Sequence, residues 1–174
     1  MREVVIVSGA RTAIGDYMGS LSNFTPMQLG ITVLNAAIAK AGIDKKLVEE
    51  VVAGQCNQAG GPGNTARHVA LGAGLPVESF AFTVHQQCPS SMRASELLSQ
   101  EIMLGKIDCG AVVGVESMSG APYLLFGARK GYRLNDGERI QDSLQIGGLV
   151  DAALGYHMGR SEEHTSELQS LSHL

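Results

Sequence analysis

The chain has 174 residues, of which 44% are hydrophobic and 17% are charged, so it is long enough and apolar enough to bury a core and is unlike a disordered chain. Its net charge of −4, with no basic stripe in the sequence, argues against nucleic acid as a partner. No apolar run reaches the roughly 18 residues of a membrane span, and the start is too quickly polar for a signal peptide, so we expect a cytoplasmic protein that does not bind membranes.

Short apolar runs alternate with helical segments along the first two thirds of the chain. The apolar runs predict strands at Val4–Ser8, Val51–Gly54, Phe80–Val84 and Ala111–Val115. Helical spacing predicts helices over 26–41, 65–72 and 89–104, the first with Thr25 as its N-cap and Pro26 at its first position. This order predicts an α/β layered fold, in which helices cover a mostly parallel, mixed sheet.

The character of the sequence changes after Glu116. Residues 117–159 are rich in glycine and show little periodicity, so we expect a long loop or a small irregular subdomain, which in compact proteins is often functional. The polar stretch 160–170 matches the translation of a common sequencing adapter over eleven consecutive residues. We therefore predict that 160–174 is a non-native tail, and that the natural coding sequence continues beyond Gly159.

Cys88 stands between the predicted strand Phe80–Val84 and the helix that follows it. We expect Cys88 at the helix N-cap and Pro89 at the first helical position, where unpaired backbone N–H groups and the helix dipole favour a reactive thiolate. A buried structural cysteine is the alternative, and these residues alone do not decide between the two. The chain has three cysteines at irregular spacing, which is typical of neither a disulfide framework nor a zinc site.

Five segments, taken together, resemble the thiolase family in its own order and at its spacing. They are Val4–Gly15 with an A-R-T-x-x-G stretch, Glu50–Arg67 with G-x-x-x-N-x-A-R, Phe82–Cys88 at the nucleophile, Glu116–Tyr123 with E-S-M-S-x-x-P-Y, and Gly155–Gly159 with G-Y-H-M-G. Each motif alone is weak, but a series covering residues 1–159 is specific. The resemblance implies a thiolase-like fold, with 1–117 as an incomplete N-terminal half and 118–159 as the start of a CoA-binding loop subdomain.

The resemblance also implies an enzyme, an acyl-CoA C-acyltransferase. The favoured activity is that of an acetyl-CoA C-acetyltransferase, which converts two acetyl-CoA reversibly into acetoacetyl-CoA and CoA. Cys88 would carry the acyl group and hold its oxyanion with its own backbone N–H, while His157 and Met158 would line the CoA pantetheine and acyl pocket. Family members use CoA thioesters as substrates, need no metal or organic cofactor, and form homodimers or homotetramers.

The chain departs from the family pattern in two places. It reads Cys88-Pro89-Ser90-Ser91 where many thiolases read C-G-S-G or C-S-S-G, which suits a first helical turn but leaves the preferred acyl chain length open. The family's G-H-P histidine, second C-x-G cysteine and asparagine have no match in these residues, and the strand-end position of His85 favours a structural or solvent role over that of a base. We therefore expect this chain by itself to be inactive, although the full-length protein is an enzyme.

Four other functions are alternatives to this one. A nucleotide-binding Rossmann module needs G-x-G-x-x-G after its first strand, which neither Ser8–Ala13 nor Gly60–Gly63 supplies. A β-ketoacyl synthase differs around its cysteine, and a non-catalytic thiolase-like binding protein would lack Cys88. A degradative 3-ketoacyl-CoA thiolase uses the same groups, and residues 1–159 do not separate it firmly from the biosynthetic enzyme.

Overall fold

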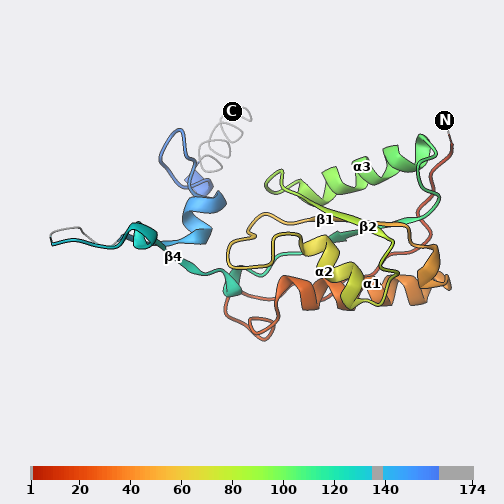
Figure 1. Ribbon diagram of the computed structural model, residues 1–174, viewed down its shortest axis with the longest axis horizontal. Coiled ribbons are helices and arrows are strands. Elements are labelled where there is room, and N and C mark those ends of the chain that lie inside the picture. Colours follow the sequence, from red (N-terminus) through yellow and green to blue (C-terminus); the bar gives the residue numbers. More distant parts are fainter. Residues whose placement is uncertain (1, 135–138, 161–174) are drawn as a thin grey trace, which may run out of the picture. The chain divides into compact units, whose positions relative to one another are not determined.

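The computed structural model describes residues 2–134 and 139–160 and divides the chain into two compact units between Gly120 and Ala121 (Figure 1). The tail predicted to be non-native lies outside the described residues, apart from Arg160. No helix in the described ranges combines the length and the apolar character that crossing a bilayer requires.

The first unit is built on a parallel sheet in the order β2-β1-β3, which confirms the predicted α/β class. The strands are β1 (Glu50–Gly54), β2 (Phe80–Val84) and β3 (Gly110–Gly114). In the register of the sheet, Gly54 lies beside both Val84 and Gly114, so the three strands end level with one another. The segments that leave these carboxyl ends therefore start at one edge of the sheet.

Helices cover both faces of this sheet, with α3 (Ser90–Met103) on one side and α1 (Pro26–Ala41) and α2 (Thr65–Gly72) on the other (Figure 1). The faces follow from the alternation of side chains along β1. Val51 packs in the apolar cluster beneath α1 and α2, and Val52 packs in the smaller cluster beneath α3. Both valines are fully buried, so the core of this unit is two-sided.

The first helix begins and ends where its local sequence predicts. The Thr25 hydroxyl accepts the backbone N–H of Gln28 at 3.2 Å, and the Gln28 side-chain oxygen accepts the N–H of Thr25 at 2.9 Å, which makes a capping box. Pro26 occupies the first turn, and Gly42 ends the helix at φ +68°. These signals lie within one turn of each helix end, so they act without help from tertiary contacts.

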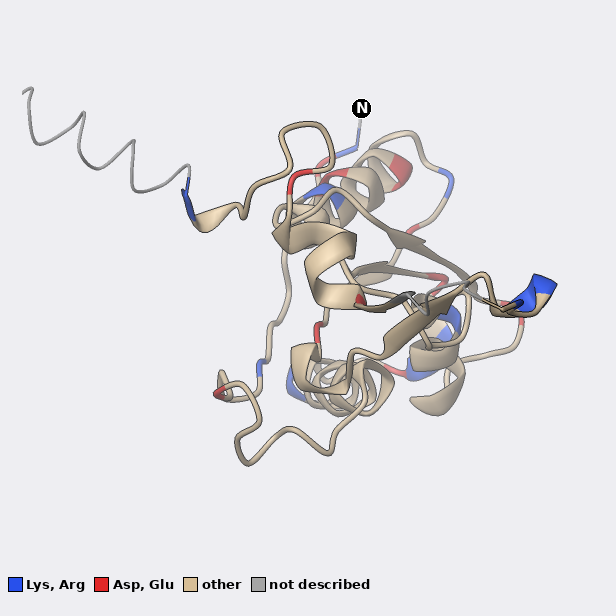
Figure 2. Cartoon of the chain, turned by 90° about the vertical axis from the view of Figure 1, so that its left-hand side faces the viewer, with Lys and Arg blue, Asp and Glu red and all other residues tan. Residues whose placement is uncertain are grey.

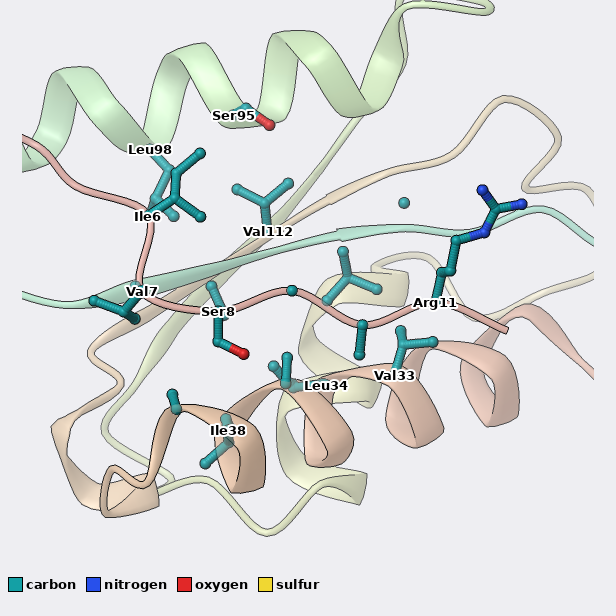
Figure 3. Close-up of a pocket in the computed structure, with 18 of the residues that line it drawn as sticks. Ile6, Val7, Ser8, Arg11, Val33, Leu34, Ile38, Ser95, Leu98 and Val112 are labelled. Atoms are coloured by element: carbon teal, nitrogen blue, oxygen red, sulfur yellow. The ribbon is translucent and has the colours of Figure 1, made fainter. Parts of the chain in front are cut away.

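The predicted strand Val4–Ser8 is wrong, because this segment makes no ladder with its neighbour β3. Figure 3 shows it passing between α1 and α3 alongside the sheet, and a cavity of about 1030 Å³ is lined by this segment, by both helices and by β3. Ile6 is 94% exposed, although its apolar neighbours would suit a buried strand. An apolar run forms a strand only where its backbone groups meet a partner, and here the cavity lies between the segment and the edge of β3.

The second unit contains more regular structure than the expected loop or irregular subdomain. Strands β4 (Tyr123–Phe126) and β5 (Arg139–Asp142) pair in an antiparallel ladder. A π-helical turn follows at Gln145–Leu149. Short 3-10 turns lie at Lys45–Leu47 and Met118–Gly120 in the first unit and at Ala128–Lys130 in the second.

Candidate active site

The carboxyl edge of the parallel sheet brings together three chemically active side chains from distant parts of the chain. Cys56 follows β1, Cys88 follows β2 and Glu116 follows β3, and all three line one open pocket of about 360 Å³. The rest of the lining comes from Gly54, Gln55, Ser90, Ser91, Gly114 and Val115. Ligands of parallel α/β sheets bind at this edge, so the pocket is the candidate active site.

Cys88 is exposed and lies in a tight turn immediately before α3. The Ser90 N–H donates to the Gln87 carbonyl at 3.0 Å, so Cys88 and Pro89 are the two central residues of this turn. The prediction that Cys88 is the N-cap is wrong by one residue, because the cap is Pro89, whose carbonyl accepts the N–H of Arg93 at 2.9 Å. The thiol thus stands just outside the helix, at the mouth of the pocket.

The peptide before Cys88 is held in an unusual conformation. Gln87 has φ +52°, in the left-handed region that non-glycine residues rarely adopt. Its carbonyl accepts three hydrogen bonds, from the Ser90 N–H at 3.0 Å, from the Ser90 hydroxyl at 2.5 Å and from the Cys56 thiol at 2.9 Å. The Ser90 hydroxyl also accepts the N–H of Gln86 at 2.9 Å. These contacts hold the strained turn in one shape.

Two glycines let the start of α3 approach the sheet. A Cβ atom on Gly54 would lie 2.4 Å from the backbone nitrogen of Ser91, and one on Gly114 would lie 2.4 Å from the Ser91 hydroxyl oxygen. At Gly54 the contact is with backbone, so a larger residue there requires movement of the helix, whereas at Gly114 the contact is with the Ser91 side chain. The glycines at the ends of β1 and β3 therefore fix how close the Cys88 turn lies to the pocket.

Glu116 ties the ends of β1 and β3 together. One oxygen of its half-buried carboxylate accepts the backbone N–H groups of Cys56 at 2.8 Å and Asn57 at 3.2 Å. In the sequence, Glu116 stood out only as part of the E-S-M-S-x-x-P-Y motif, and Cys56 only as one of three cysteines. The signal that could have placed both was their position directly after two strands of one parallel sheet.

The Cys56 thiol is a hydrogen-bond donor in this site. Burial raises the pKa of the Cys56 thiol, an effect that the Ser90 hydroxyl partly opposes and that the nearby Glu116 reinforces. The thiol form of Cys56 is therefore favoured, which is consistent with the hydrogen bond from its sulfur to the Gln87 carbonyl.

The other predicted residues are His85 in the first unit and His157 and Met158 in the second. His85 is exposed at the end of β2, as expected of a strand-end histidine. His157 and Met158 lie together in the second unit, next to a turn in which Gly155 has φ +71°. Both side chains are exposed, and the N–H of Gly159 donates to His157 Nδ1 at 3.2 Å, a contact that does not use Nε2.

The described residues contain no group of three histidine, cysteine or acidic side chains placed to hold a metal ion. Figure 2 shows acidic and basic residues interspersed along the described chain.

The chain matches the model of the thiolase N-terminal domain over residues 4–173. It is 43% identical over 168 residues to an acetyl-CoA acetyltransferase of Escherichia coli K12, which covers 96% of this chain and 42% of that protein. It is 40% identical over 167 residues to an acetyl-CoA acetyltransferase of Cupriavidus necator, with the same two shares. The chain thus spans less than half the length of these relatives, and the family match takes in most of the segment predicted to be non-native.

Solved structures agree with the sequence relatives. An acetyl-CoA acetyltransferase from Syntrophomonas wolfei superposes with a TM-score of 0.90 at 44% identity, over 95% of this chain and 42% of that one. The Acat5 thiolase from Ascaris suum, solved in complex with coenzyme A, gives a TM-score of 0.85 at 30% identity, over 94% of this chain and 42% of that one. On its fold, its cysteine turn and these matches, the chain belongs to the thiolase family, whose N-terminal domain it represents.

Proposed function

We propose that Cys88 is the nucleophile of an acetyl-CoA C-acetyltransferase, which joins two acetyl-CoA molecules to give acetoacetyl-CoA and CoA, reversibly. The observation that carries the proposal is the exposed Cys88 thiol at the carboxyl edge of a parallel sheet, on a turn held rigidly by its neighbours. The relatives support the choice of acyl group, because they are named acetyl-CoA acetyltransferases.

The first chemical step is transfer of the acetyl group to the thiol. The Cys88 thiol loses its proton to a general base, the sulfur attacks the thioester carbonyl carbon and a carbon–sulfur bond forms. CoA leaves with the electron pair of the bond that breaks and takes up that proton. The carbonyl oxygen becomes negative during this attack, and on the family resemblance we infer that the Cys88 backbone N–H donates to it. A second acetyl-CoA then loses its α proton to a general base, and its α carbon attacks the acetyl carbonyl carbon. The new carbon–carbon bond forms, and the Cys88 sulfur leaves with the electron pair of the broken carbon–sulfur bond and takes up the proton.

We also propose that His157 and Met158 contact the pantetheine and acyl parts of CoA. The His157 Nε2 can hydrogen-bond a polar group, and Met158, 40% exposed, offers a flexible apolar surface. This assignment rests on the family resemblance of the segment Gly155–Gly159. Its test is a comparison of His157→Ala with His68→Ala, an exposed histidine of α2, for the affinity of the full-length protein for CoA, which only the first substitution should lower.

The acylation test uses acetyl-CoA and peptide mass spectrometry. Incubation with acetyl-CoA should place an acetyl group on Cys88, and Cys88→Ala should lose that label. Cys109→Ala should retain it, because Cys109 lies away from the pocket, at the amino end of β3. Equal labelling of Cys88 and Cys109 would show that acetylation is non-specific and would contradict the proposal. Competition between acetyl-CoA and a long-chain acyl-CoA separates the biosynthetic activity from a degradative 3-ketoacyl-CoA thiolase.

Three further features belong to the same proposal. The enzyme uses CoA thioesters without a metal or organic cofactor, it assembles as a homodimer or homotetramer, and it acts in the cytoplasm. Activity that survives exhaustive treatment with a chelator tests the first, and light scattering of the full-length protein tests the second. Cell fractionation tests the third, which matters because some relatives at 38% identity are mitochondrial.

A further inference from the structure

The three hydrogen bonds on the Gln87 carbonyl have a consequence for Cys88. A trans peptide is planar, so its C=O and N–H point in opposite directions, and every peptide bond among residues 2–134 and 139–160 is trans. Because the Gln87 carbonyl points at Cys56 and Ser90, the N–H of Cys88 points away from them. Among the described residues this N–H donates to no acceptor, so it is available to an oxygen of a bound group.

Rotation of the Gln87–Cys88 peptide plane would exchange the directions of its C=O and N–H. The hydrogen bonds around this peptide determine which of the two orientations is stable. The positive φ of Gln87 is strained, and strain of this kind persists only where neighbouring groups over-determine the conformation. Two of the three donors belong to Ser90, which is buried, local and part of the same turn. The third donor, the Cys56 thiol, comes from 31 residues earlier and anchors the turn to the end of β1.

We propose that Cys56 is a positioning residue for Cys88: its thiol fixes the Gln87 carbonyl and so aims the Cys88 N–H at the oxygen of the acyl group. The inference rests on the proposed function, in which Cys88 carries that group. Glu116 extends the same support, because its carboxylate holds the Cys56 backbone N–H at 2.8 Å. Cys56 itself forms no bond to the substrate and is not a nucleophile in this scheme.

The test compares two reactions of the same Cys88 sulfur. In acylation by p-nitrophenyl acetate, the sulfur attacks the ester carbonyl, p-nitrophenolate leaves with the electron pair, the thiol proton passes to solvent, and a transient oxyanion needs the Cys88 N–H. In alkylation by iodoacetamide, the sulfur displaces iodide from a saturated carbon and no oxyanion forms. A group that only orients the N–H therefore affects the first reaction and leaves the second alone.

The informative variants are Cys56→Val, which keeps a similar volume but removes the donor, and Cys56→Ser, which keeps a donor. In the 174-residue chain, Cys56→Val should slow acylation of Cys88 by about tenfold, less than the loss of a whole oxyanion donor, and change alkylation less than twofold. Cys56→Ser should restore most of the acylation rate. Cys109→Val is the matched control for removing a half-buried thiol and should change neither rate.

Several outcomes would overturn the inference. One is an equal fall of the acylation rate and the alkylation rate of Cys88 in Cys56→Val, and another is no fall in either rate. A third is acylation of Cys88 in the wild-type chain by p-nitrophenyl acetate no faster than that of Cys109. If circular dichroism shows that Cys56→Val is unfolded, Cys56→Ala takes its place in the same comparison. Incubation of the full-length protein with acetyl-CoA separates the two proposals: absence of acetyl-Cys88 there contradicts the proposed function, whereas the p-nitrophenyl acetate rates of the 174-residue chain still decide the role of Cys56.

Discussion

The carboxylate of Glu116 accepts a hydrogen bond of 2.8 Å from the backbone N–H of Cys56, sixty residues earlier in the chain. The contact joins the ends of two neighbouring parallel strands, β1 and β3, at the edge where Cys88 lies. It therefore links the stability of the sheet edge to the shape of the candidate active site.

Removal of the Glu116 carboxylate should destabilise the fold. Glu116→Ala leaves the half-buried N–H groups of Cys56 and Asn57 without this acceptor, so we expect a loss of about 0.5–1.5 kcal/mol, the net contribution of a typical hydrogen bond. Urea unfolding of the 174-residue chain measures the change in the free energy of unfolding. Glu78→Ala removes an exposed carboxylate and should change it little; equal stability of the two variants would mean that the Glu116 contact contributes nothing.

A methyl group at Gly54 should push α3 away from the sheet. Its Cβ would lie 2.4 Å from the Ser91 backbone nitrogen, and backbone cannot yield as a flexible side chain can. We expect Gly54→Ala to lose about 1–3 kcal/mol of stability, as overpacking does, and to slow iodoacetamide alkylation of Cys88. Gly63→Ala is the matched control, since a Cβ there meets nothing within 4 Å. A Gly54→Ala protein as stable as this control would contradict the close packing.

Cys88 should be alkylated before the other two cysteines. Its thiol is exposed, whereas burial raises the pKa of both Cys56 and Cys109, which lowers their thiolate fraction at neutral pH. Limited iodoacetamide treatment near pH 7.5, followed by peptide mass spectrometry, should find the label mainly on Cys88. In urea the three rates should converge. Similar rates in the folded chain would refute the predicted difference in accessibility.

Stability should fall as pH rises through the titration of Glu50. Burial, reinforced by repulsion from Glu101 and partly offset by Lys106, raises the pKa of Glu50 above its ordinary value of 4.5. The folded chain therefore holds this proton more tightly than the unfolded chain, so the stabilisation is complete at low pH and is lost between the unfolded and folded pKa values. Glu50→Gln cannot titrate and should abolish that loss.

The measurement is the free energy of unfolding of the two proteins at about pH 4 and about pH 7. Relative to wild type, Glu50→Gln should gain stability at the higher pH. Glu78→Gln, at an exposed position, serves as the control and should follow the wild-type curve. An identical pH dependence for wild type and Glu50→Gln would contradict the raised pKa.

The 174-residue chain by itself should not catalyse thiolysis of acetoacetyl-CoA. Its sequence contains no match to the family's G-H-P histidine or C-x-G cysteine, so Cys88 lacks the groups that should activate it and exchange the substrate proton. Loss of absorbance from the acetoacetyl-CoA enolate measures the reaction, with the acetyl-CoA acetyltransferase of Escherichia coli as positive control. A rate above the protein-free background that depends on Cys88 would disprove this expectation.

The features whose causes are local could be predicted from the sequence. Thr25, Pro26 and Gly42 define the first helix, because capping groups and backbone preference act within one turn. The apolar runs of β1, β2 and β3, separated by helical segments, predicted the parallel sheet. The motif series identified the family and singled out Cys88.

How distant segments meet could not be predicted, because it depends on the packing of the whole fold. The run Val4–Ser8 has a strand-like composition but no backbone partner, which no local pattern can show. Cys56, Cys88 and Glu116 converge because three parallel strands end level, and the Gln87 turn keeps its strained shape because Cys56 reaches it across 31 residues. Strand pairing and long-range side-chain hydrogen bonds depend on which segments the fold brings together. Capping residues and hydrophobic periodicity act locally, so they do not specify those pairings.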